Sequence, residues 1–70
     1  MQGEIKSVET IYLVVAVDKY TKKWYVLNDF YNDYCALKYL ELVPKLYPEY
    51  NHFFVCSYVK NEIIAEIKPH

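Results

Sequence analysis

The stretch ETIYLVVAVD, Glu9 to Asp18, is apolar on both of the faces that a β-strand presents. A strand with two apolar faces is covered on both sides, so we expect it at the centre of a sheet rather than at an edge. Any fold of this chain must therefore be built around this strand. Its faces consist of Ile11, Leu13, Val15 and Val17 on one side and Tyr12, Val14 and Ala16 on the other.

Three further segments have the alternation and composition of strands. The polar connection Lys19 to Lys23 separates the first strand from a second at about Lys23 to Asn28, which predicts a hairpin. His52 to Lys60 and Glu62 to Ile67 predict another hairpin around Lys60-Asn61. The last segment alternates apolar and acidic residues, which is typical of a half-solvated edge strand. We expect Ile63, Ala65 and Ile67 to point inward and Glu62 and Glu66 to point outward.

A helix is predicted between the two hairpins. Asn32 offers an N-cap and Asp33 a favourable negative charge in the first turn. Pro44 lacks a backbone donor, so we expect the regular helix to end or kink near Val43, and Pro48 closes the segment. Apolar residues at three- and four-residue spacing form the face that we expect to pack: Ala36, Leu37, Leu40, Val43 and Tyr47.

These elements predict one α+β domain, residues 1–70, of ββαββ form, with the polar lead-in 1–8 frayed. We expect a four-stranded antiparallel sheet in the order 2-1-3-4, with the helix packed on one face. The other face, or an unpaired edge strand, is then the best candidate for an interface. We expect the uncovered face to carry Tyr12, Val14, Phe54, Cys56, Tyr58 and Ile64, or the complementary set.

Composition favours self-association. Hydrophobic residues make up 54% of the 70 residues, and aromatic residues 19%, which is more apolar area than one small core hides. We therefore expect a homodimer. No signal sequence is visible, and the apolar run 11–17 is far shorter than the about 20 residues needed to span a membrane. Cys35 and Cys56 are expected to be buried free thiols in a reducing cytoplasm.

The histidines, cysteines and acidic residues do not have the spacing of a catalytic site, a metal site or a cofactor-binding motif. The single glycine, Gly3, excludes a glycine-rich phosphate loop and a nucleophile elbow. His52 and Cys56 share a strand face but lie about 13 Å apart, too far for one ion. Cys35 and His70 add no ligand spacing, and Asp29 and Asp33 are explained by the helix start. We predict that the protein is not an enzyme and holds neither metal nor cofactor.

Tyrosines gather between Phe30 and Tyr50, around the predicted helix. A tyrosine supplies a large, stiff contact area and a hydrogen bond, which is why protein interfaces are enriched in it. The alternative for each ring is a wedge between helix and sheet with its hydroxyl in water. The partner-binding residues that we predict are Tyr31, Asp33, Tyr34, Tyr47 and Tyr50.

Two other functions remain open. Lys19, Tyr20, Lys22 and Lys23 precede Trp24 in one hairpin, an interleaving that can stack a base and contact phosphates. Eight lysines without arginine, and a net charge of -1, argue against nucleic-acid binding. The second alternative is a dimer that holds a small ligand between aromatic-lined sheets.

The run from Val14 to Tyr50 resembles small uncharacterised proteins of phages and mobile elements. In those, a strand hairpin leads to an F-x-[SND]-x-x-x-A-x-x-Y helix start, and an aromatic strand such as His52 to Tyr58 follows. The resemblance implies a compact accessory protein in the cytoplasm of a bacterial host. It further implies an inhibitor that occludes a defence protein such as a CRISPR effector, as small anti-CRISPR proteins do. The matching helix-start positions are Phe30, Asn32, Ala36 and Tyr39.

Overall fold

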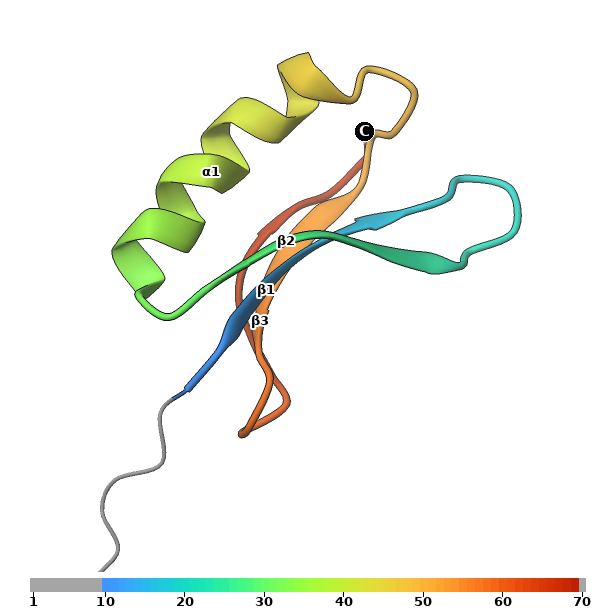
Figure 1. Cartoon of the computed structure of the whole chain (residues 1–70). Coiled ribbons are helices and arrows are strands. Elements are labelled where there is room, and N and C mark those ends of the chain that lie inside the picture. The colour runs from blue at the N-terminus through green and yellow to red at the C-terminus, as the bar shows by residue number, and fades with distance from the viewer. Residues whose placement is uncertain (1–9, 70) are drawn as a thin grey trace, which may run out of the picture.

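A computed structural model describes residues 10–69 of the chain, and its elements follow the order ββαββ (Figure 1). The predicted lead-in 1–8, together with Glu9 and His70, lies outside the described residues. Neighbouring strands are all antiparallel, in the order β2-β1-β3-β4, which confirms the predicted fold class and the central place of the first strand. The elements are β1 (Tyr12–Val17), β2 (Trp24–Phe30), α1 (Asp33–Leu46), β3 (Phe53–Ser57) and β4 (Glu62–Ile67).

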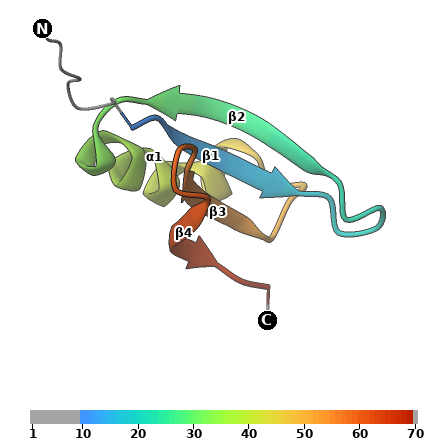
Figure 2. The same cartoon turned by 90° about the horizontal axis from the view of Figure 1, so that it is seen from below.

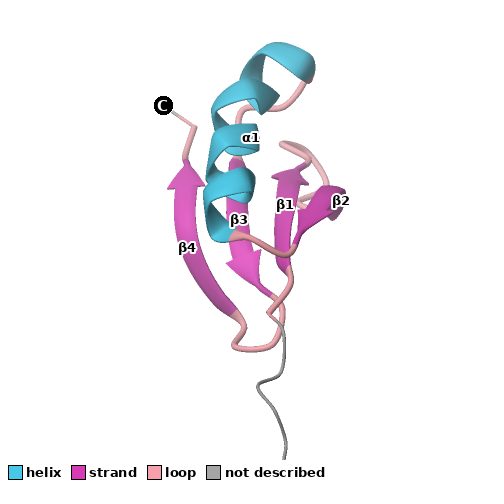
Figure 3. Ribbon diagram, turned by 60° about the vertical axis from the view of Figure 1, so that its left-hand side comes forward, coloured by secondary structure: helices cyan, strands magenta, loops and turns pink. Residues whose placement is uncertain are grey.

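The helix covers one face of the sheet. It lies over β3 and β1, while β4 stands to one side of it (Figure 3). Side chains from α1, β1 and β3 meet there in the main core, which we call the helix-side core. Each of its central residues is at most 6% exposed: Val14, Ala16, Ala36, Leu40, Val43, Phe53 and Val55.

The ends of α1 follow from local chemistry. The Asn32 side chain accepts a hydrogen bond from the Cys35 amide at 3.2 Å, as expected of an N-cap. The expected end near Val43 is wrong, because α1 continues through Pro44 to Leu46. Proline removes one hydrogen bond, but the Tyr47 amide donates to the Val43 carbonyl at 2.8 Å and closes the last turn.

Both outer strands contain a β-bulge. In β2 the register shifts between the partners of Val14 and Val15, and Leu27 is the extra residue. In β4 the extra residue is Ile64, between Ala65 and Ile63. The predicted alternation of β4 is therefore wrong at Ile63 and Glu62. The bulge moves Ile63 to the face opposite Ala65, and Glu62, which pairs with Ser57, to the same face as Ala65.

The predicted composition of the uncovered face is also wrong. Val14 stands opposite Val55, and Val15 opposite Phe54, so Val14 lies under the helix while Phe54 does not. Seen from below, the strands lie in front of α1, and the uncovered face turns to the viewer (Figure 2). We call it the open face, and its residues are Leu13, Val15, Val17, Trp24, Val26, Asp29, Phe54, Cys56, Ile63 and Glu66.

Candidate functional site

At the centre of the open face, two rings instead of a helix lie next to Phe54: that of Trp24 and that of His52, whose centroid is 6.2 Å from the Phe54 ring. Val15, Val17 and Phe54 are 1%, 6% and 2% exposed. Trp24, opposite Val17 on β2, places its ring edge-on to Phe54, with ring centroids 4.9 Å apart. The indole itself is 64% exposed. It therefore shields Phe54 with one side and presents the other to solvent.

A groove runs beside this indole. It has a volume of about 230 Å³ and lies between Trp24 and Ile63, with Phe54, Cys56 and Asn61 completing its lining. Val26 and Ile63, on the two outer strands, are 58% and 53% exposed. Exposed apolar side chains around an apolar groove are what a protein-binding surface offers an anchoring side chain of its partner.

The charged residues of the open face lie on its two outer strands. Asp29 on β2 stands opposite Leu13, and Glu66 on β4 stands opposite Phe54. The Glu66 carboxylate lies 2.7 Å from the Nε2 atom of His52. Burial raises the pKa of the Cys56 thiol, which keeps this side chain neutral and a poor nucleophile. The arrangement suits apolar contact and lacks an activated group for catalysis among the open-face residues.

The open face is a better candidate than either sheet edge. Bulges in β2 and β4 interrupt the ladder on both outer strands, a device that discourages pairing with another strand. The exposed residue Asp29 on β2 and the acidic pair Glu62 and Glu66 on β4 add charge to these strands. The sequence leaves open whether a partner binds the uncovered face or an edge strand, and these features of the outer strands favour the face.

The five predicted partner-binding residues lie in two separate groups. Tyr31 and Tyr34 are 74% and 65% exposed at the start of α1, where Asp33 is also exposed. Tyr47 and Tyr50 are half-buried and pack against the helix-side core at the other end of α1. The 14-residue helix separates the groups by about 20 Å, so they do not form one site.

Local contacts explain the difference between the groups. The Lys38 amine lies 5.7 Å from the centre of the Tyr34 ring, an exposed cation–π contact. Tyr50 has ring neighbours at 6.3 Å, Tyr25 on one side and Phe53 on the other. A hydrogen bond with the Tyr47 hydroxyl raises the pKa of Tyr39. Tyr47 and Tyr50 therefore make packing contacts within the chain, whereas Tyr31 and Tyr34 are largely exposed.

The lysine hairpin contains a fixed negative charge. Its side chains Lys19, Tyr20, Lys22 and Lys23 are exposed, Tyr20 to 84%. The Asp18 carboxylate accepts hydrogen bonds of 2.8 Å from the amides of Tyr20 and Thr21, which lowers the pKa of Asp18. An ionised carboxylate at the base of the loop opposes phosphate binding by the lysines around it.

The free thiols differ from expectation. Cys35 is exposed on α1 and Cys56 is half-buried on the open face, so neither is the fully buried thiol that was predicted. Cys35 is the third residue of α1, in its first turn, and the buried stripe begins one residue later at Ala36. Cys56 lies on the sheet face that no helix covers.

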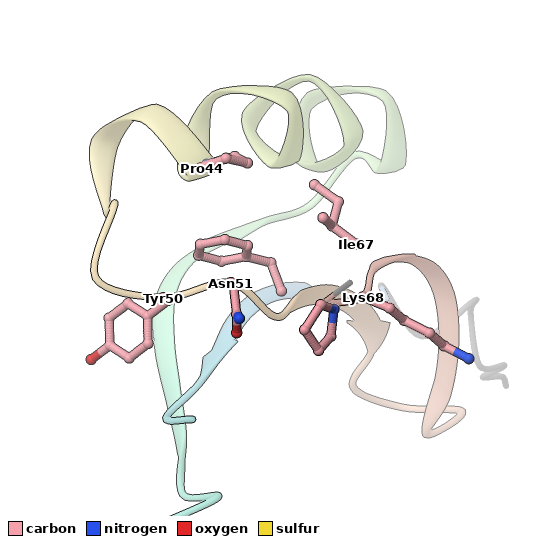
Figure 4. A pocket seen from close by; sticks show the side chains of 7 residues that line it. Pro44, Tyr50, Asn51, Ile67 and Lys68 are labelled. Carbon is pink, nitrogen blue, oxygen red and sulfur yellow. The ribbon is translucent and has the colours of Figure 1, made fainter. Parts of the chain in front are cut away.

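A second cavity, of about 340 Å³, lies where α1 passes β3 and the end of β4 (Figure 4). Its volume is at the low end for ligand pockets. Figure 4 shows the Tyr50 hydroxyl and the Lys68 amine pointing away from each other, so these polar groups do not converge on one ligand. The cavity is lined by Pro44, Tyr50, Asn51, Phe53, Ile67, Lys68 and Pro69.

Sequence reasoning missed the residues that define the groove. The sequence predicts a strand that includes Trp24 but suggests a binding role for this residue only beside the lysines, although two-residue alternation places it on one face with Val26. Ile63 was assigned to the inward face, and only the bulge at Ile64 reveals its true side.

Comparisons with protein-family models, curated proteins and solved structures gave no match to the chain. Among residues 10–69, no helix is both long and apolar enough to cross a membrane. Within the same residues, histidine, cysteine and acidic side chains form no group of three that could hold a metal ion. The function is therefore argued from the geometry of the surfaces.

Proposed function

We propose that the protein is a non-catalytic protein-binding module that binds its partner through the open face. The observation that carries this proposal is the exposure of Trp24, Val26 and Ile63 on a sheet face that α1 does not cover. Isolated exposed apolar residues are normal, but three on one sheet face, two of which line an apolar groove, are typical of an interface.

The proposal includes narrower forms. A homodimer in the cytoplasm, expected from the composition, is one form that this binding can take. Another is an inhibitor, encoded by a phage, that occludes a bacterial defence protein such as a CRISPR effector. That form is supported by the resemblance of the helix start and of the strand after it, and Tyr31, Asp33 and Tyr34 offer it an exposed surface outside the open face.

An affinity experiment with matched variants tests the proposal. Val26→Asp places a charge on the open face, and Leu42→Asp places the same charge on α1 at a residue of similar exposure, 52% against 58%. We expect wild-type protein and Leu42→Asp to retain a protein partner, either another protein or free copies of this chain, and Val26→Asp to lose it. Equal retention by all three proteins would contradict the proposal.

The nucleic-acid alternative is tested by the hairpin. Retention of the protein on single-stranded DNA or RNA that falls with salt, and that is lost in a Lys22→Glu, Lys23→Glu double variant, would support it. We expect no retention at physiological salt, because Asp18 offsets part of the lysine charge.

A further inference from the structure

We infer that the protein which packs on the open face is a second copy of the same chain. The inference rests on the proposed function, because it names the occupant of the same surface. Two sheets would then lie face to face, about 10 Å apart, with their strands turned by about 30°. Each copy would supply the layer that the other lacks opposite its helix.

Charge is the first argument for a second copy. A two-fold interface brings the same surface patch together from both subunits, so a charged patch would repel itself. The exposed apolar residues of the open face are Trp24 and Ile63, which line the groove, and Val26, the next residue on the same face of β2. Its two carboxylates lie on opposite outer strands, Asp29 on β2 and Glu66 on β4, and His52 lies 2.7 Å from Glu66. The central strands of the open face therefore carry no charge that a second copy would repel.

Composition is the second argument. Interfaces between different proteins that also exist apart are about as polar as the rest of the surface, whereas interfaces of homodimers are more apolar. The groove on the open face is lined by three apolar side chains, one neutral thiol and one amide. A mainly apolar lining of this kind favours a homodimer.

Size is the third argument. Strands of five to seven residues give the open face a length of about 20 Å, and four strands give it a width of about 15 Å. A second copy presents a surface of the same dimensions and can cover the face completely. The area is small beside the roughly 800 Å² per partner of a standard interface, so the dimer is expected to be reversible.

The two copies also complete each other's groove. The groove of about 230 Å³ between Trp24 and Ile63 is open to solvent in the single chain. A second copy brings its own Trp24, Val26 and Ile63 to the same surface, and one of these side chains can enter. The tryptophan that covers Phe54 would then be covered in turn, as in the buried centre of an interface.

Sedimentation velocity over about 10 μM to 1 mM, the range in which weak interfaces form, tests the inference. We expect the wild-type protein to pass from monomer to dimer, and Leu42→Asp to do the same. Val26→Asp should weaken dimerisation at least about 100-fold, because a two-fold interface meets each substitution twice. Circular dichroism checks that Val26→Asp is folded, which its exposure in the single chain makes the expected result.

A charge-swap pair keeps the test independent of folding. Val26→Asp and Val26→Lys should each be monomeric alone, and an equal mixture should recover dimers. A wild-type protein that is monomeric at every concentration overturns the inference, and so does a dimer that Val26→Asp leaves intact. If the wild type is monomeric while Val26→Asp still loses a different retained protein, the second copy is excluded and the protein-binding proposal stands.

Discussion

The two faces of the sheet are built from alternate residues of the same strands but are covered in different ways. On the helix side, Phe53 and Val55 lie beneath a hydrogen-bonded helix. On the open face, Phe54 is equally buried, yet the rings that lie against it are those of His52 and of Trp24, whose indole is itself 64% exposed. The burial of a core residue therefore does not show whether the group that packs on it is also buried. The two faces differ in the solvent exposure of that second layer of side chains.

The largest expected difference is between two neighbouring phenylalanines, 1% and 2% exposed. Phe53→Ala should cost about 3–5 kcal/mol, because the helix and the sheet cannot both collapse into the cavity. For a chain of this size that loss is comparable to the whole stability. Phe54→Ala should cost about 2 kcal/mol, since the indole of Trp24 is free to settle into the space. Urea unfolding of both variants measures the difference, and equal costs would show that the two faces are equally rigid.

Removal of the cover itself gives a smaller effect. Trp24→Ala should cost about 1–2 kcal/mol, because the edge-on contact with Phe54 and a partly buried surface are lost. Trp24→Phe should recover about half of this. The same urea experiment, followed by circular dichroism, provides the values. A Trp24→Ala variant as stable as the wild type would mean that the indole shields nothing.

The secondary-structure elements and the strand order agree with the sequence-based prediction, whereas the assignment of side chains to the two sheet faces does not. The apolar run of β1, the N-cap Asn32 and the acidic alternation of β4 were enough to predict the elements and the strand order. The two faces could not be predicted fully for two reasons. The sequence does not give the register of β1 and β3, in which Val14 stands opposite Val55 and not Phe54. The bulge in β4 adds one residue and inverts the assignments beyond it. Ile63 is the position where this matters most, since it forms one side of the groove.

The tyrosines show a different limit. Helical spacing distinguishes the buried stripe Ala36, Leu40 and Val43 from the exposed Tyr34, but it does not show what lies beyond the last turn. Tyr50 packs on Phe53 because the chain folds back after α1. Such a contact depends on tertiary structure, so periodicity cannot reveal it.

Weakening the helix should affect only the covered face. Asn32→Ala removes the side-chain acceptor of the Cys35 amide and should cost about 1 kcal/mol, whereas Asn32→Asp should be nearly neutral. Neither change should alter dimerisation through the open face. Urea unfolding measures the stability and sedimentation the association. If Asn32→Ala changes association as strongly as Val26→Asp, the two faces are not independent.

The smallest expected effect is the pH dependence of the hairpin that leads into Trp24. The amides of Tyr20 and Thr21 hold the pKa of Asp18 below its ordinary value of 3.8. A folded-state pKa that is depressed stabilises the fold above pH 3.8, and this contribution is lost as the pH falls through the lower folded-state value. In Asp18→Asn, the free energy of unfolding should therefore fall less as the pH is lowered below about 3.8. Unfolding curves at pH 6 and about pH 3 compare the two proteins, and an unchanged slope would contradict the assignment.

Trp24 is the single tryptophan of the chain, so its fluorescence reports on the open face directly. The most direct measurement is its emission maximum across a dilution series of the wild-type protein, with Leu42→Asp and Val26→Asp alongside. If the open face binds a second copy, the emission of the wild type and of Leu42→Asp moves to shorter wavelength as concentration rises, while Val26→Asp stays at the long wavelength of an exposed indole. An emission maximum that is the same for all three proteins at every concentration would contradict the account.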